Sequence, residues 1–371
     1  MAVSWSRSLP FALVILLLLA LTFHSLTASA LWTLTPTSFY RLKSPSGKSP
    51  SGLEPAEQVT DPKTLLPHIP PKIWQVSILP DSIDSQDPIQ PPPYAIKWLS
   101  LHPSFAYTIV NAAGALAAVT RLENHFQSQK NDANHLSSNW AGSVQRRRNR
   151  RNIQGDLRPE TFKTTQLYTA IAQPVMQADF VRYALLALEG GIYSDSDTYP
   201  LRPLRDWVPQ EFRNHTQLIV GIEADSQPPV EGTTYPVQFG QWTIAGTKGH
   251  PVFLKMLRRI LGEVRWRTEG FPTDGVVEQD IQAGFTNEDI LRVSGPAGWT
   301  EEIYEYLSDV TETSFTWRNL TGLENPVLFH DILILPIDGF ATGVPHSGAS
   351  IEPSGLTMVK HDFLGSWKHQ V

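Results

Sequence analysis

The 371-residue sequence contains no cysteine, so it can form neither a disulfide nor a zinc site with thiolate ligands. It also lacks a basic excess: the formal net charge of −6 gives no general attraction to nucleic acid, and no nucleic-acid partner is expected. No internal repeat is evident. With 41% hydrophobic and 18% charged residues, the composition excludes a disordered chain and indicates a globular α/β protein.

Proline is abundant, and many of the 30 prolines lie between residues 36 and 93. Residues 33–68 are rich in Pro, Ser, Thr and Gly and cannot bury enough surface to fold alone, which predicts a stalk. A second such segment, at about residues 127–158, contains the basic run at residues 146–151. We interpret it as a solvated low-complexity insertion in the folded domain.

One long apolar run lies near the N-terminus, from Phe11 to Leu21. We interpret residues 1–32 as a signal-anchor or signal segment, and the length of the run favours an uncleaved membrane anchor. Ala28-Ser29-Ala30 resembles a cleavage site, so secretion after cleavage is the alternative. Glycosylation sequons at Asn214 and Asn319 are compatible with a lumenal domain.

Strands and helices are expected to alternate from residue 69 onward. The expected strands are Lys72–Ile78, Phe105–Val110, Ile192–Ser194 and Leu218–Ile222, and the expected helices are Pro93–Leu101, Ala112–Phe126, Pro174–Leu188 and Pro251–Leu261. Such alternation predicts one α/β domain, residues 69–371, with a mostly parallel, doubly wound sheet. Ligands of such sheets bind beyond the carboxyl ends of the strands.

Two acidic residues follow one of the expected strands. Gly190-Gly191 ends a helix, and Asp195 and Asp197 come after the next short apolar step. In an extended segment they point the same way, so both carboxylates converge and repel unless they share a cation. Mg²⁺ or Mn²⁺ suits such a pair, and His361 is a candidate imidazole ligand. The ordinary alternatives are a solvated turn and a surface histidine.

Two other residue pairs each allow a structural and a functional interpretation. Asp179 and Arg182 share a helix face, either as an ordinary ion pair or as contacts for a nucleotide ribose and its diphosphate. Trp74 and Gln75 lie in the first strand, either as core residues or as the wall against which a base stacks. The residues alone leave both choices open.

Four blocks together have the order and spacing of one family. They are Pro71–Gln75, Gln177–Tyr183, Gly190–Asp197 and His361–Trp367. The sequence resembles glycosyltransferase family 32, the group of fungal initiating α-1,6-mannosyltransferases of the Golgi outer-chain pathway, over roughly residues 68–369 without the insertion. Gln241–Ile244 resembles the acceptor-side block of that family, and Ser294-Gly295-Pro296 resembles its Thr-Gly-Pro step. Ser77 stands where family members often carry a second tryptophan.

The resemblance implies a GT-A-like single domain, a nucleotide-sugar donor and a divalent metal, Mn²⁺ or Mg²⁺. It assigns catalysis and the metal to Asp195 and Asp197, and it places His361, the candidate third ligand of the metal, in the C-terminal segment that closes over the diphosphate. Donor binding is assigned to Trp74, Gln75, Asp179, Arg182, Tyr183, Ser366 and Trp367, and the acceptor side to Gln241 and Trp242.

The implied reaction is retaining transfer of mannose from GDP-mannose to a mannose of an N-linked oligomannose glycan, in α-1,6 linkage. The implied setting is a single-pass type II Golgi membrane protein with a lumenal catalytic domain, alone or in a hetero-complex with other Golgi transferases. Two alternatives stay open: another nucleotide-sugar donor or a lipid acceptor, and a non-catalytic Golgi sugar-binding or scaffold protein on the same fold. The sequence shows no convincing nucleophile for a double displacement, so no general base is assigned.

Overall fold

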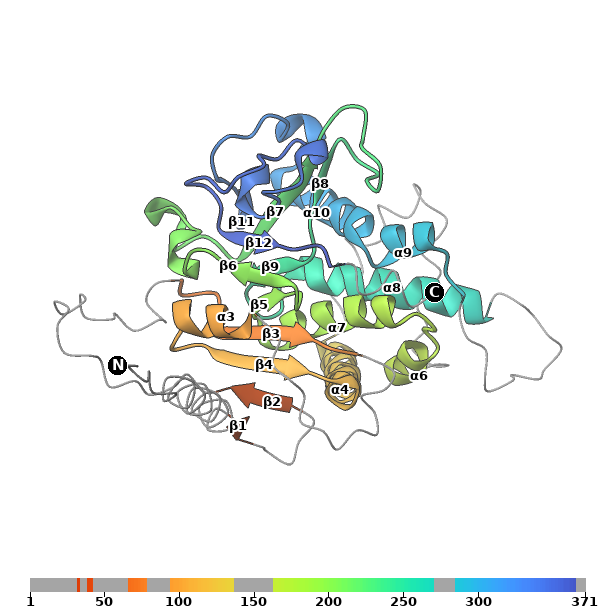
Figure 1. Ribbon diagram of the computed structural model, residues 1–371. Helices are drawn as coiled ribbons and strands as arrows, with labels where there is room; N and C mark the ends of the chain where they lie inside the picture. The colour runs from red at the N-terminus through yellow and green to blue at the C-terminus, as the bar shows by residue number, and fades with distance from the viewer. Residues whose placement is uncertain are drawn as a thin grey trace, which may run out of the picture.

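The computed structural model describes residues 32–33, 39–42, 66–78, 94–136, 163–269 and 284–364 (Figure 1). The expected anchor at residues 1–32, apart from Trp32, lies outside this part, as do the basic run 146–151, Ser366 and Trp367. Within the described residues, no helix has both the length and the apolar character needed to cross a bilayer.

A mixed β-sheet forms the centre of the molecule (Figure 1). Its strand order is β1-β2-β4-β3-β5-β9-β7-β11-β10, with β8 paired to β7. The strands are β1 (Trp32–Thr33), β2 (Phe39–Leu42), β3 (Lys72–Val76), β4 (Ala106–Val110), β5 (Gly191–Ser194), β7 (Leu218–Asp225), β8 (Val237–Phe239), β9 (Thr243–Gly246), β10 (Val327–Phe329) and β11 (Ile332–Leu335).

The direction of the strands confirms a mostly parallel centre. Strand β3 pairs in parallel with β4 and β5, and β7 pairs in parallel with β11. Strand β9 is antiparallel to both β5 and β7, so β5 and β7 point the same way. The alternation of helices and strands did not predict β9, because β8 and β9 follow β7 without an intervening helix.

Two segments add antiparallel pairs to this frame. Strand β2, within the segment predicted as a stalk, pairs with β4 and extends the edge of the sheet. Strand β6 (Thr198–Pro200) pairs with β12 (Val359–His361) in a separate small sheet. This second pairing brings the C-terminal block of the sequence to the loop that carries the acidic pair.

The connection between α7 (Pro174–Glu189) and β5 requires its two glycines. Pro174 occupies the first turn of α7, where its missing N–H costs nothing, and the helix ends at Gly190 with φ +64°. A Cβ on Gly190 would lie 2.6 Å from the backbone nitrogen of Lys248, and one on Gly191 would lie 2.6 Å from the carbonyl oxygen of Lys72. The Gly-Gly break therefore lets β5 enter the sheet directly beside β3.

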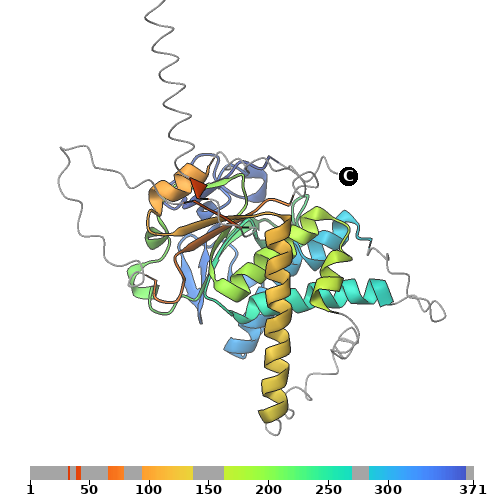
Figure 2. The ribbon, with the colours of Figure 1, turned by 90° about the horizontal axis from the view of Figure 1, so that it is seen from below.

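Helices cover the two faces of the sheet unevenly (Figures 1 and 2). One face carries α4 (Ala112–Leu136), α6 (Thr164–Thr169), α7, α8 (Pro251–Glu269) and α10 (Pro296–Thr311), and α9 (Asn287–Val293) packs beside them; the other carries α3 (Ala95–Leu101). The expected helices are all present, but α4 ends at Leu136 rather than Phe126 and extends beyond the other helices (Figure 2).

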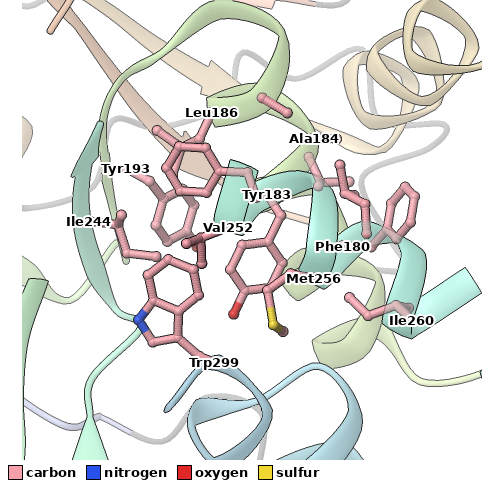
Figure 3. Packing of buried hydrophobic residues seen from close by; sticks show 14 of the residues in the cluster. Phe180, Tyr183, Ala184, Leu186, Tyr193, Ile244, Val252, Met256, Ile260 and Trp299 are labelled. Atoms are coloured by element: carbon pink, nitrogen blue, oxygen red, sulfur yellow. The ribbon is translucent and has the colours of Figure 1, made fainter. Parts of the chain in front are cut away.

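The larger core lies under α7, α8 and α10 (Figure 3). Trp299 is fully buried there, with its ring centroid 5.4 Å from that of Tyr183 and 6.1 Å from that of Phe253. Burying one such large side chain stabilises the fold by about 2 to 3 kcal/mol. This packing fixes α7, and with it the polar residues that α7 points toward the acidic pair.

Candidate active site

Asp195, Asp197 and His361 come together at the carboxyl edge of the sheet. Asp195 directly follows the last residue of β5, and His361 pairs with Thr198 across β6 and β12. Each of the three side chains offers one ligand atom, and these atoms lie within 4.8 Å of one another. All three side chains are partly exposed, so the cluster is open to an incoming ligand.

Asp197 is held by the C-terminal strand. His361 Nε2 lies 3.0 Å from Asp197 Oδ1, and the backbone N–H of Leu364 donates to Oδ2 at 3.0 Å. Burial raises the pKa of Asp197, but the hydrogen bond and charge of His361 and the N–H of Leu364 outweigh it and lower the pKa below its usual value. Asp197 is therefore a carboxylate at neutral pH.

Aromatic rings fix the orientation of His361. Its ring centroid lies 3.9 Å from that of Phe363 and 5.0 Å from that of Trp242. Its Nδ1 atom is buried and has no hydrogen-bond partner among the described residues. The imidazole is thus oriented by packing, while Nε2 faces the acidic pair.

Asp195 is positioned from the opposite side. Tyr193, two residues earlier and on the same face of β5, donates its hydroxyl to Asp195 Oδ1 at 2.6 Å, and Arg182 Nη2 donates to the same oxygen at 3.2 Å. Burial holds the pKa of Tyr193 well above its usual value, so the hydroxyl keeps the proton that it donates. The Arg182 guanidinium lies 4.6 Å from the centre of the Tyr193 ring. Asp195 therefore has a fixed rotamer.

A buried polar network lies behind Asp195. Asp179, only 1% exposed, accepts from Arg182 at 3.1 Å, from Gln241 Nε2 at 3.1 Å and from the Ser294 hydroxyl at 2.7 Å. Arg182 Nη1 donates to the Gln241 carbonyl at 2.9 Å, and Tyr183 donates its hydroxyl to Gln241 Oε1 at 2.6 Å. Gln241, predicted on the acceptor side, is thus tied to residues predicted on the donor side.

Burial has the largest effect on the pKa of Asp179 in this network. It raises the pKa of Asp179 to about 6, against the lowering effects of Arg182 and Ser294. Asp179 and Arg182 are three residues apart on α7, as the helix periodicity predicts. Their burial excludes the ordinary surface ion pair as an interpretation.

Trp74 and Gln75 support the site from within the core. Gln75 has no exposed surface: its Nε2 donates to the Asp195 carbonyl at 3.0 Å, and its Oε1 accepts from the Tyr107 hydroxyl. Trp74 is 8% exposed, and its indole N–H donates to the Gly190 carbonyl at 2.8 Å. Gln75 therefore holds the backbone at Asp195, and its direct contact with a donor stays a prediction.

The two predicted glycosylation sites, Asn214 and Asn319, are exposed, and their modification stays a prediction. The sequence reasoning did not single out Tyr193, although it lies two residues before Asp195 and the same alternation that paired the two aspartates places it on their face. No local pattern indicated Phe363 as a ring beside His361.

The donor set fits a divalent cation. Two carboxylates and one imidazole converge within ligand-sharing distance, and hard oxygen ligands suit Mg²⁺ and Mn²⁺. Arg182 supplies one positive charge beside Asp195, which leaves net negative charge for a cation to balance.

Residues 93–213 match the family model described as a glycosyltransferase sugar-binding region containing a DXD motif. The matched segment includes Asp179, Arg182 and the Asp195–Asp197 pair. The predicted family resemblance is confirmed. Residues 93–213 are thus similar to a glycosyltransferase sugar-binding region, and Asp195-Ser196-Asp197 within them has the DXD pattern.

Two curated relatives are named initiation-specific alpha-1,6-mannosyltransferase. The chain is 40% identical over 209 residues to the one from Schizosaccharomyces pombe, which covers 56% of this chain and 50% of that one. It is 32% identical over 220 residues to the one from Candida albicans, which covers 54% and 56% respectively. The chain thus spans about half the length of these curated relatives.

One solved structure, titled PaToxG Glycosyltransferase, has 14% sequence identity and a TM-score of 0.34, with 72% of this chain and 84% of that chain covered. This likeness is too weak to define the fold.

Proposed function

We propose that the protein is a metal-dependent retaining glycosyltransferase that moves mannose from GDP-mannose to a mannose of an N-linked oligomannose glycan, in α-1,6 linkage. The observation that carries the proposal is the convergence of Asp195, Asp197 and His361 at the carboxyl edge of the sheet. The names of the relatives, which specify mannosyl transfer, support the choice of sugar and linkage.

Asp195, Asp197 and His361 would hold Mn²⁺ or Mg²⁺. When bound, the cation supplies positive charge that stabilises the negative charge developing on the departing diphosphate. Tyr193 and Arg182 keep Asp195 in one rotamer before any ligand arrives, and the N–H of Leu364 does the same for Asp197. Such preorganisation lowers the cost of reaching the transition state.

The buried network supports a donor-sugar site beside Asp195. A carboxylate accepts from sugar hydroxyls, and a guanidinium donates to hydroxyl or phosphate oxygens. Asp179 and Arg182, which are 1% and 5% exposed and are fixed by Gln241 and Ser294, would contribute these groups from α7 beside Asp195. Ser366 and Trp367 are proposed to close over the diphosphate from the C-terminal segment.

We place the protein in the Golgi membrane as a single-pass type II protein with a lumenal catalytic domain. The support is the apolar run in residues 1–32 and the two exposed sequons. Residues 33–68 would form the stalk, apart from Thr33 and Phe39–Leu42, which pair in the sheet, and Leu66, which is buried in the core. Assembly with other Golgi transferases is part of the same proposal.

The test is donor-dependent turnover by the full-length protein in detergent. We expect mannose transfer to an α-mannoside from GDP-mannose, but not from UDP-galactose or UDP-N-acetylglucosamine, with linkage analysis showing an α-1,6 product. A chelator should abolish the activity, and added Mn²⁺ should restore it. Transfer from another donor would change the substrate assignment. Donor binding without hydrolysis or transfer would support the non-catalytic alternative and overturn the proposal.

A further inference from the structure

A carboxyl group outside the proposed donor site lies at the same edge of the sheet. Glu223 is near the end of β7, and β7 points the same way as β5, which ends at Asp195. Only β9 lies between these two strands, so two inter-strand spacings, about 10 Å, separate β5 from β7. Glu223 and the acidic pair therefore border the same carboxyl edge.

A three-residue segment connects the two positions. Gly240, Gln241 and Trp242 lie between β8 and β9, both of which pair with β7. The N–H of Gly240 donates to the Gly221 carbonyl of β7 at 3.0 Å, and the N–H of Asp195 donates to the Trp242 carbonyl at 2.8 Å. The same segment thus touches β7 at one end and the acidic pair at the other.

Glu223 is crowded by protein but remains partly accessible to solvent. One of its oxygens accepts from Nε2 of Gln238, which is 1% exposed and whose own Oε1 accepts from the N–H of Thr234 at 2.8 Å. Burial raises the pKa of Glu223 to about 8, although the hydrogen bond from Gln238 opposes this. At neutral pH the group mostly keeps its proton, so it can both donate and accept a hydrogen bond.

Trp242 provides a polar group without a partner near the same edge. Its side chain is 9% exposed and packs against Ala341 and Ala349, and its ring lies 5.0 Å from that of His361. Its indole N–H is buried and has no hydrogen-bond partner among the described residues. A buried donor without a partner is costly, so its presence next to the site points to a ligand that accepts from it.

We propose that Glu223 binds the acceptor sugar, with its carboxyl group hydrogen-bonded to hydroxyls of the terminal mannose. This inference rests on the proposed function. The groups assigned to the donor, Asp179 and Arg182, reach Asp195 from α7, whereas Glu223 lies on the far side of β9 from Asp195. A neutral carboxyl group with one fixed amide partner suits an uncharged sugar, which offers hydroxyls as donors and acceptors and no phosphate.

Two reactions of the full-length protein separate acceptor binding from donor chemistry. One is mannose transfer to α-1,6-linked or α-1,2-linked mannobiose at saturating GDP-mannose, and the other is hydrolysis of GDP-mannose without acceptor. We expect Glu223→Ala to raise the KM for the acceptor at least tenfold, and Glu223→Gln to raise it by less, with hydrolysis within twofold of the unmodified protein. Glu231→Gln, an exposed position in the connection between β7 and β8, is the matched control and should change neither reaction.

The outcomes distinguish this inference from the function on which it rests. An acceptor KM within twofold of normal in both Glu223 variants, with hydrolysis intact, would overturn the acceptor role and leave the proposed function standing. An equal fall of transfer and hydrolysis would also overturn it, because Glu223 would then act on the donor or on the fold. Thermal unfolding of Glu223→Gln separates those two cases. Absence of both reactions in the unmodified protein would instead reject the proposed function.

Discussion

Two clusters of the same residue types lie at opposite edges of the sheet. At the carboxyl edge, Asp197 pairs with His361. At the amino edge, Asp331 immediately precedes β11 and accepts from the Tyr306 hydroxyl at 3.0 Å. His330 Nδ1 also lies 3.0 Å from Asp331, and His250 Nε2 lies 3.5 Å from it.

The two clusters differ in what remains unsatisfied. Asp331 is 7% exposed, and its carboxylate is surrounded by donors of the protein itself. Burial alone raises the pKa of Asp331, but hydrogen bonds from His250, His330 and Tyr306 and the charge of His250 lower it to about 2. At the other edge, Asp195 and Asp197 are partly exposed and share one imidazole. We call the cluster around Asp331 closed, because the protein itself supplies the partners of its carboxylate, and such a cluster stabilises the fold. We call the cluster of Asp195, Asp197 and His361 open, because it leaves negative charge that a ligand can neutralise.

The largest expected effect is that of Asp197→Asn on activity. The amide keeps the shape but removes a charge from the open cluster, so mannose transfer should fall about 1,000-fold while the unfolding temperature changes little. The measurement is turnover of GDP-mannose at saturating Mn²⁺ together with thermal unfolding. Asp206→Asn, at an exposed position, is the control and should leave both unchanged. Retention of more than a tenth of the activity would contradict the assignment of Asp197.

Asp331→Asn should show the reverse pattern. We expect a loss of about 3 kcal/mol in the free energy of unfolding at pH 6, because the histidines lose their anionic partner, and a transfer rate within twofold of normal. A carboxylate with a lowered pKa stabilises the fold above about pH 4, and this contribution disappears as the pH falls toward 2.

Urea titrations of Asp331→Asn and the unmodified protein between pH 2 and pH 7 would test this, and the two curves should converge at the acidic end. A stability change below about 0.5 kcal/mol, or a large loss of activity, would erase the distinction between the two edges.

Local patterns predicted the elements of the site better than its connections. The apolar spacing of α7, the Gly-Gly break and the i, i+2 alternation after β5 placed Asp179, Arg182 and the acidic pair correctly. These predictions depend only on residues close together in the chain, where the helix and strand periods decide the direction of a side chain.

The remaining contacts join residues far apart in the sequence. Ser294 reaches Asp179 from the junction of α9 and α10, and Gln241 reaches it from the segment before β9. Propensity could not indicate either contact, because both depend on the antiparallel insertion of β9 and on α10, neither of which the sequence pattern predicted. The burial that raises the pKa of Asp179 and Glu223 likewise follows from tertiary packing alone.

The smallest expected effect concerns Asp179. Its carboxyl group lies at the same edge of the sheet as the open cluster, but it is buried. Its pKa in the fold, about 6, is above the value of about 3.9 for an unfolded chain. The folded state therefore holds the proton more tightly, and the free energy of unfolding should fall by about 2 kcal/mol as the pH rises from 4 to 6. This sign is opposite to that of Asp331. Asp179→Asn, which stands in for the neutral form, should flatten the curve over this window.

Urea titrations at pH 4, 5, 6 and 7 would measure the effect, with Asp206→Asn as the exposed control that keeps the slope of the unmodified protein. If the slope between pH 4 and 6 survives in Asp179→Asn, another group carries it, and Asp179 is ionised throughout. The buried network would then resemble the closed cluster around Asp331, and its charge would be balanced by Arg182 within the protein rather than left for a ligand.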